Sequence, residues 1–418
     1  MGIPFYVASL LKTHKHIARD LIEQDCYDVL AIDFNCFIHT YLKSENPIGS
    51  IIVALHDFLG HTVLTRKVYI AFDGLVPYAK MVQQRYRRFR NPEMASSFDK
   101  HQISPGTPYM RELADTIRFM FPYVEVSGTD EPGEGEHKIF LWLRDMPAAE
   151  RRRVCIYGLD ADLVLISVAQ RSLGDLYLMR EKQKEEGFSL FSVSALAGAL
   201  PIPADEFVEM SVLCFGNDFM PNIGIFSLRE DGYARALYYK QQSTLEKAAE
   251  DEAGLLLKRA KDTDRHILAP DGQALEARMG IHLFDGVLNW DPVVYAFWKT
   301  YAWTLAYFKT SKVPDWEWAY PYPEAPLLSA LLEFDRKTKF KWTAPSPTFT
   351  IEDQLRFILP EESLKKVGLE PKYPDELYEE ERDTRHRWMK RFVWECDPYV
   401  SLPWGPLTSV SEIRLAQV

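Results

Sequence analysis

Cysteine is scarce in this chain, and long uncharged apolar runs are missing. The cysteines are Cys26, Cys36, Cys155, Cys214 and Cys396, with no CxxC pair, which argues against a disulfide framework and against a structural zinc site. No run of about eighteen uncharged apolar residues occurs, and the N-terminus lacks the basic start, apolar stretch and cleavage site of a signal peptide. We therefore expect a soluble, non-secreted protein of a reducing compartment, without a membrane partner, and we predict the cytoplasm.

Positive charge is also in short supply. The chain has 49 lysines and arginines against 60 aspartates and glutamates, so its formal net charge is -11. Nucleic-acid binding depends on basic residues that replace the counterions of the polymer, so any such site must come from a local basic cluster. With 47% hydrophobic and 26% charged residues, the composition is otherwise that of a globular protein with enough apolar material for two cores.

Three apolar runs end in aspartate and read as buried strands. They are DVLAID at residues 28–33, KVYIAFDG at 67–74 and VCIYGLDAD at 154–162. Helical periodicity lies between them, for instance in IIVALHDFL at 51–59. This alternation of strand and helix predicts an α/β fold with a parallel or mixed central sheet flanked by helices.

Acidic residues recur where these predicted strands end. Ligands of open α/β sheets bind beyond the carboxyl ends of the strands, so acids from separate strands can converge on one site. Further acids lie in the turn GEGE, which leads into a helix, and in CFGNDFMP, after a helix that begins near residue 205. The candidate acids are Asp33, Asp73, Glu134, Glu136, Asp160, Asp162 and Asp218. Each alone could simply cap a helix, but three strands that end alike make that the weaker interpretation.

So many carboxylates in one place would repel one another and have raised pKa values unless cations neutralise them. Hard oxygen ligands favour Mg²⁺ or Mn²⁺. Two such ions about 3.5–4 Å apart can activate a water and stabilise the leaving oxygen during attack on a phosphodiester. The acids therefore predict hydrolysis of a nucleic acid.

A basic helix follows directly after Asp73. In FDGLVPYAKMVQQRYRRFR, the side chains of Lys80, Gln84, Arg87 and Arg88 recur at spacings that place them within one or two turns of a shared helix face. Arginine offers bidentate donors to phosphate oxygens, and lysine offers a point charge. A solvated basic face is the usual meaning of such a run, but its closeness to a predicted metal ligand favours a site for a terminal phosphate.

The character of the chain changes after the first 230 residues. A charge-rich stretch with good helix formers, residues 240–265, resembles a solvated helix or a linker. Clustered aromatic residues follow it. We therefore divide the chain into a core at 1–230, a charged helical linker at 231–289, and a second, smaller aromatic-rich region at 290–418 that packs on the core.

Several motifs occur in the order seen in Xrn-type 5′-to-3′ exoribonucleases. They are MGIPFY, DFNCFIH, FDGLVPYAKMVQQRYRRF, ISPGTPYM, EGEHKI, YGLDADLVLI, LMRE and FGNDFMP, between residues 1 and 221. The chain closely resembles this family, and it resembles the flap endonucleases only in the acidic design of their core. The resemblance implies a PIN or flap-nuclease-like core.

The resemblance also implies roles for individual residues. The seven acids match the metal ligands of the family, which implies two Mg²⁺ ions per site, with Mn²⁺ as a substitute. Lys80, Gln84, Arg87 and Arg88 match the pocket that selects a 5′-monophosphate and rejects capped or triphosphate ends by size. His39 matches the histidine on which the first base stacks, and Trp316 or Trp318 would sandwich that base. Taken singly, such a histidine is more often a structural polar residue, and each tryptophan is as readily a core or interface residue. Stacking on aromatic rings tolerates any base sequence.

The implied activity is processive hydrolysis of single-stranded RNA with a 5′-monophosphate to nucleoside 5′-monophosphates. Decapping machinery is an expected partner, and a monomer is the expected state. Two alternatives stay open: a structure-specific nuclease that cuts DNA flaps, and a nuclease-derived protein that binds RNA ends without cutting. Retention of all seven acids argues against a pure binder, because clustered negative charge repels phosphate.

The chain departs from the family in three places. The link at 91–102 is much shorter than the long helical excursion of the family, and Pro323-Glu324 replaces the usual His-Tyr after YPY. FTIEDQLRFILPEESLKK and KRFVWECDPYVSLPW still resemble the end of the second conserved region, but the stretch between them is compressed. We therefore expect a minimal catalytic unit without a protruding tower.

Overall fold

The computed structural model describes most of the chain. The described residues are 3, 5–22, 25–42, 44–61, 64–90, 99–182, 186–262, 289–322, 325–334 and 338–372. Several features noted above lie outside them: Cys396, most of the short 91–102 link, the Pro323-Glu324 pair and the part of the second conserved region at 373–418. Cys26, Cys36, Cys155 and Cys214 are free thiols.

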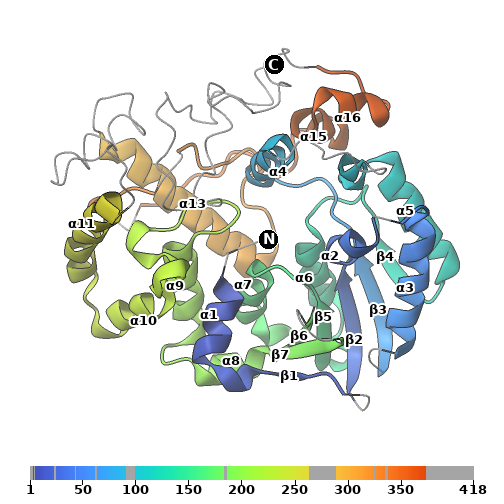
Figure 1. Ribbon diagram of the computed structural model, residues 1–418, viewed down its shortest axis with the longest axis horizontal. Coiled ribbons are helices and arrows are strands. Elements are labelled where there is room, and N and C mark those ends of the chain that lie inside the picture. Colours follow the sequence, from blue (N-terminus) through green and yellow to red (C-terminus); the bar gives the residue numbers. More distant parts are fainter. Residues whose placement is uncertain are drawn as a thin grey trace.

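A seven-stranded mixed sheet forms the centre of the molecule, with the strand order β1-β7-β6-β5-β2-β3-β4 (Figure 1). The strands are β1 Ala18–Asp20, β2 Cys26–Asp33, β3 Leu64–Ala71, β4 Val124–Ser127, β5 Arg153–Tyr157, β6 Asp175–Glu181 and β7 Phe188–Ser192. β6, β5, β2, β3 and β4 run parallel, and β7 is antiparallel to its neighbours β6 and β1. The prediction of a parallel or mixed central sheet is confirmed.

Helices cover both faces of this sheet. On one face lie α1 Tyr6–Thr13, α6 Gly135–Asp145, α7 Asp162–Ala169, α8 Val193–Ala199 and α9 Ala204–Phe215, and on the other lie α2 Phe34–Ile38, α3 Pro47–His61 and α5 Pro108–Met120. The central strand β2 serves both layers, because Val29 and Ala31 face the first and Leu30 and Ile32 face the second. A strand that is buried on both faces has apolar residues at consecutive positions. This is why apolar and polar residues do not alternate in DVLAID.

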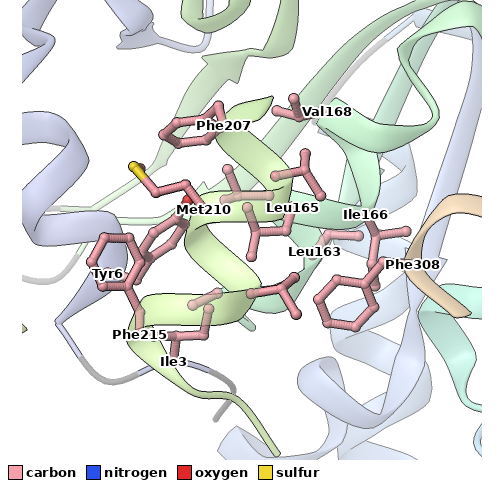
Figure 2. Packing of buried hydrophobic residues seen from close by; sticks show 14 of the residues in the cluster. Ile3, Tyr6, Leu163, Leu165, Ile166, Val168, Phe207, Met210, Phe215 and Phe308 are labelled. Carbon is pink, nitrogen blue, oxygen red and sulfur yellow. The ribbon is translucent and has the colours of Figure 1, made fainter. Parts of the chain in front are cut away.

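The first layer is tightly packed with large side chains. In Figure 2, Tyr6 of α1 lies beside Met210 and Phe215 of α9, and the labelled side chains of α7 lie between α9 and Phe308. Phe308 belongs to a later helix of the chain, α13 Trp290–Thr310. α7 therefore packs both on α9 and on a helix of the second region of the chain.

The remaining helices connect through irregular segments such as residues 338–350. These helices are α4 Tyr78–Arg90, α10 Gly232–Gln242, α11 Leu245–Asp262, α13 Trp290–Thr310, α14 Leu328–Leu332, α15 Ile351–Ile358 and α16 Glu361–Lys366, with short 3₁₀ turns at Lys15–Ile17, His39–Tyr41, Lys100–Ile103, Ala148–Glu150, Arg171–Leu173, Gly224–Phe226 and Leu228–Glu230. α13 runs across the molecule and packs on α7 and α9, and α15 packs on α4 (Figure 1). In the described part of the chain, no helix is long and apolar enough to cross a membrane.

The three-part division of the chain stays a prediction. Of the segment predicted as a linker, residues 263–288 lie outside the described part. The portion that is described forms α10 and α11, and side chains such as Ala236, Tyr239 and Ala248 are buried in the main core.

Candidate active site

The candidate acids all lie at the carboxyl edge of the parallel strands or in turns beside it. Asp33 ends β2, Asp73 lies two residues beyond the end of β3, and Asp160 lies three residues beyond the end of β5. Glu134 is the N-cap of α6, and Glu136 lies in its first turn. Asp162 begins α7, and Asp218 follows α9. Two predicted strands therefore end earlier than expected, at Ala71 and Tyr157, because the chain turns there to start the acidic loops.

Glycine allows α6 to approach the strand ends. A Cβ atom on Gly135 would lie 2.7 Å from Asp33 Oδ1 and 3.1 Å from the carbonyl oxygen of Ala71. The Gly135 backbone N–H instead donates to Asp73 Oδ1 at 2.7 Å, and Asn35 Nδ2 donates to Asp73 Oδ2 at 3.1 Å. These two hydrogen bonds orient the Asp73 carboxylate.

The acids lie close enough together to perturb one another electrostatically. Burial, followed by repulsion from Asp73 and Asp160, raises the pKa of Asp33 to about 8. Burial also raises the pKa of Glu136, with repulsion from Glu134 and Asp33, and it raises the pKa of Asp162, with repulsion from Asp218 and Asp160. Each of the seven acids thus interacts with at least one other, as expected for carboxylates that share a site.

One lysine lies among these carboxylates. Lys80 Nζ is 2.6 Å from Glu134 Oε2 and 2.7 Å from Asp218 Oδ2, and the side chain is almost fully buried. Burial opposes ionisation of Asp218, but the Lys80 ammonium outweighs it and lowers the pKa of that carboxyl to about 2. Lys80 therefore acts as a counter-ion of the acid cluster in this structure, whereas the sequence predicts it in a phosphate pocket.

The residues present fit a divalent cation. Asp33 Oδ1 and Asp162 Oδ1 are buried and have no hydrogen-bond partner within the described structure. Carboxylate oxygens are the donors that Mg²⁺ and Mn²⁺ prefer, and added positive charge would relieve the repulsion that raises these pKa values. No group of three or more His, Cys, Asp or Glu side chains in the described ranges is already arranged as a metal site, and the Lys80 ammonium lies between two of the acids.

Three of the four predicted phosphate ligands lie together, farther along α4 than Lys80. Arg88 Nε donates to Ser104 Oγ at 3.1 Å and Arg88 Nη1 to the carbonyl oxygen of Gln84 at 3.3 Å. Burial and the neighbouring Arg87 lower the pKa of Arg88 to about 9. Gln84 is buried, and its Oε1 has no partner among the described residues.

His39 lies near Asp160 of the acid cluster and near Arg87 and Arg88 of α4. Part of the His39 ring is exposed. Partial burial lowers the pKa of His39, and the positive charges of Arg87 and Arg88 lower it further. The negative charge of the nearby Asp160 opposes this shift. The structure therefore brings the predicted stacking histidine, the basic helix face and a catalytic candidate acid close together.

The two candidate stacking tryptophans differ in their surroundings. Trp316 is 8% exposed, packs in an apolar cluster between α4 and α15, and accepts a hydrogen bond from Tyr78 N at its carbonyl oxygen. Trp318 is half-buried, donates from Nε1 to Thr300 Oγ1 at 3.0 Å, and carries Lys299 Nζ 3.9 Å from its ring centre. Base stacking by either one stays a prediction.

Sequence reasoning missed three residues that orient this site. Tyr307 of α13 donates from its hydroxyl to Glu134 Oε1 at 3.0 Å, and Asn35 exchanges hydrogen bonds with Asp73. Gln354 of α15 accepts from the N–H of Val76 at 2.8 Å and donates to the carbonyl oxygen of Gly74. Asn35 lies two residues after Asp33, a signal that could have revealed it; nothing local in the sequence marks the other two.

The fold and the site define a class: an α/β protein with a carboxylate-rich site at the carboxyl ends of its parallel strands. Residues 1–96 and 91–182 match the family described as XRN 5′-3′ exonuclease N-terminus. These matches lie within the first 182 residues, less than half of the chain, and they confirm the resemblance to Xrn-type proteins that its motifs predict.

Several similar proteins are named 5′-3′ exoribonucleases. 5′-3′ exoribonuclease 1 of Saccharomyces cerevisiae is 26% identical, in a match that covers 50% of this chain and 18% of the yeast protein. The 5′-3′ exoribonuclease 2 homolog of Caenorhabditis elegans is 28% identical, with 51% and 33% covered, and 5′-3′ exoribonuclease 1 of Homo sapiens is 28% identical, with 45% and 14% covered. The matched part therefore spans a third or less of each of these relatives.

Solved structures show more remote likenesses. The catalytic core of Rad2 in complex with a DNA substrate is 14% identical, with a TM-score of 0.41, and 88% of this chain and 98% of that chain are covered. Flap endonuclease-1 from Methanococcus jannaschii is also 14% identical, with a TM-score of 0.38 and with 58% and 80% covered. Likenesses this remote add nothing to the assignment.

Proposed function

We propose that this chain is a 5′-to-3′ exoribonuclease that processively hydrolyses single-stranded RNA with a 5′-monophosphate to nucleoside 5′-monophosphates. The observation that carries the proposal is the convergence of seven acids beside a basic helix. Acids alone would repel a polyanion, and basic residues alone would only bind it. Their juxtaposition in a chain that resembles Xrn-type proteins supports binding and cleavage of a phosphodiester at one place.

The acids are the residues that would hold two Mg²⁺ ions, or Mn²⁺ in their place. Bound there, the metal would activate a water and stabilise the leaving oxygen of the phosphodiester. The protein orients the carboxylates: the Gly135 N–H and Asn35 hold Asp73, and Tyr307 holds Glu134. Lys80, which lies between Glu134 and Asp218, would add a positive charge near the bound RNA.

The basic face of α4 is the proposed site for the 5′-phosphate. Arg87 and Arg88 would supply charge-assisted hydrogen bonds, and Gln84 a neutral donor. His39 lies close to both arginines, where it can stack on the first base. After each cut the new 5′-phosphate can move onto the same residues, so processivity needs no other energy source.

The test is degradation of one RNA, labelled at either end, that carries a 5′-monophosphate, a 5′-triphosphate or a 5′-hydroxyl. We expect release of labelled mononucleotide from the 5′-monophosphate RNA with Mg²⁺ and none with a chelator. Internal cuts would support the rival flap-type DNA nuclease, and competition between RNA and flap DNA separates the two. Intact RNA in every case would support a protein that binds RNA ends.

Finer features of the proposal follow from the same assignment. Single-stranded RNA is the expected partner, and decapping machinery would supply the 5′-monophosphate ends. The cytoplasm is the proposed compartment, and a monomer the proposed state, which sedimentation or light scattering of the purified chain would measure.

A further inference from the structure

The α13 helix reaches the acid cluster through one side chain, Tyr307. The ring is fully buried, and its hydroxyl donates to Glu134 Oε1 at 3.0 Å. The second oxygen of that carboxylate is 2.6 Å from Lys80 Nζ. Both oxygens of Glu134 are therefore engaged, one by a residue of the sheet region and one by a residue that lies 173 positions later.

The same ring contacts the residues that follow two other acids. It stacks on His137, next to Glu136, with ring centroids 3.6 Å apart and planes 17° apart. It also lies 6.0 Å, centroid to centroid, from Phe219, next to Asp218. One tyrosine thus contacts the start of α6 and the turn after α9, two segments that are distant in the sequence.

We infer that Tyr307 is a positioning residue: it holds the Glu134 carboxylate in the orientation that a divalent cation requires, and it aligns the segments that carry Glu136 and Asp218. This inference rests on the proposed function. Partners that orient a metal-binding carboxylate typically change metal affinity or activity by 10–100-fold when they are removed. A purely structural tyrosine would change stability without changing the response to metal.

The test compares Tyr307→Phe with Tyr233→Phe in the full chain. Both substitutions remove one hydroxyl from a buried ring, and Tyr233 bonds His14 Nε2 at 2.9 Å, away from the acids. Mg²⁺ is titrated into chelator-treated protein by calorimetry, and melting temperature is measured in parallel. We expect Tyr307→Phe to weaken Mg²⁺ binding about 10-fold or more, and Tyr233→Phe to leave it unchanged.

RNA turnover gives a second readout. Saturating Mg²⁺ should restore the kcat of Tyr307→Phe, because the lost hydroxyl acts through metal affinity. Equal Mg²⁺ binding in both variants, or a turnover loss that Mg²⁺ does not restore, overturns the positioning role. Failure of the wild-type chain to bind Mg²⁺ or degrade RNA would instead overturn the proposed function, and with it this inference.

Discussion

The sheet region and the region of α13–α16 contribute to the site in opposite ways. The first supplies all seven acids and the basic face of α4, and the second supplies none of them. The second region instead supplies hydrogen bonds to the first: Tyr307 to Glu134, Gln354 to the turn after Asp73, and the Trp316 carbonyl to the start of α4. The first region carries the charge, and the second adds hydrogen bonds to those by which the first orients it.

The difference follows from the cost of grouping charges. Five of the acids are buried, and burial, followed by mutual repulsion, raises the pKa values of several of them, so the cluster opposes its own assembly. Neutral side chains of the second region hydrogen-bond Glu134 and the turn after Asp73 without adding charge to the cluster.

The largest expected effect tests the charged region. Asp162→Asn removes one ionic oxygen from a residue that begins α7 and is buried. We expect single-turnover release of mononucleotide to fall by about 1,000-fold or more, since the lost stabilisation is worth several kcal/mol, while RNA binding persists. Asp205→Asn, at an exposed ion pair with Arg171, is the matched control. A normal rate in Asp162→Asn would refute the acid assignment.

The basic face of α4 should show the next largest effect. Arg88→Gln removes a charge-assisted donor, a contact worth roughly 1.5–3 kcal/mol, or about 10- to 100-fold in KM. The KM should rise for 5′-monophosphate RNA and stay unchanged for 5′-hydroxyl RNA, so the variant loses its preference for the 5′-phosphate. Arg118→Gln on the exposed side of α5 controls for net charge. Unchanged preference would reject the phosphate site.

A smaller effect tests the positioning region directly. Gln354→Ala leaves the buried N–H of Val76 and the carbonyl oxygen of Gly74 without their partner, which should cost about 1–3 kcal/mol of unfolding free energy. Urea unfolding measures it, with the exposed Gln241→Ala as control. We also expect lower RNA turnover, because the turn after Asp73 loosens. A destabilised variant with unaltered turnover would contradict an orienting role for the region of α13–α16.

The smallest effect concerns pH. Burial raises the pKa of Asp353, but hydrogen bonds from Thr350 at the start of α15 outweigh it, so the folded-state pKa lies below the unfolded value. The carboxylate therefore stabilises the fold above about pH 4, and this contribution is lost as pH falls further. Asp353→Asn should cost about 1 kcal/mol at pH 7 and progressively less below pH 4. A pH-independent difference in unfolding free energy would contradict this account.

The parts of the molecule that could be predicted are those that depend on short stretches of sequence. The apolar runs before Asp33, Asp73 and Asp160 predicted strands of one sheet, and parallel strands bring their carboxyl ends to one edge. The position of Lys80 among the acids could not be predicted, because spacing along α4 does not reveal which residues face it. The pairing of Tyr307 with Glu134 is equally invisible, since 173 residues separate them and aromatic residues crowd the α13 segment.

Counting bound ions decides whether these acids form a divalent-cation site. Mn²⁺ is titrated into chelator-treated full-length chain and the free ion is followed by electron paramagnetic resonance, for the wild type and for Asp162→Asn. We predict two ions per wild-type chain and loss of binding in the variant. Absence of bound Mn²⁺ in the wild type, or equal binding in both, would contradict the assignment of this site.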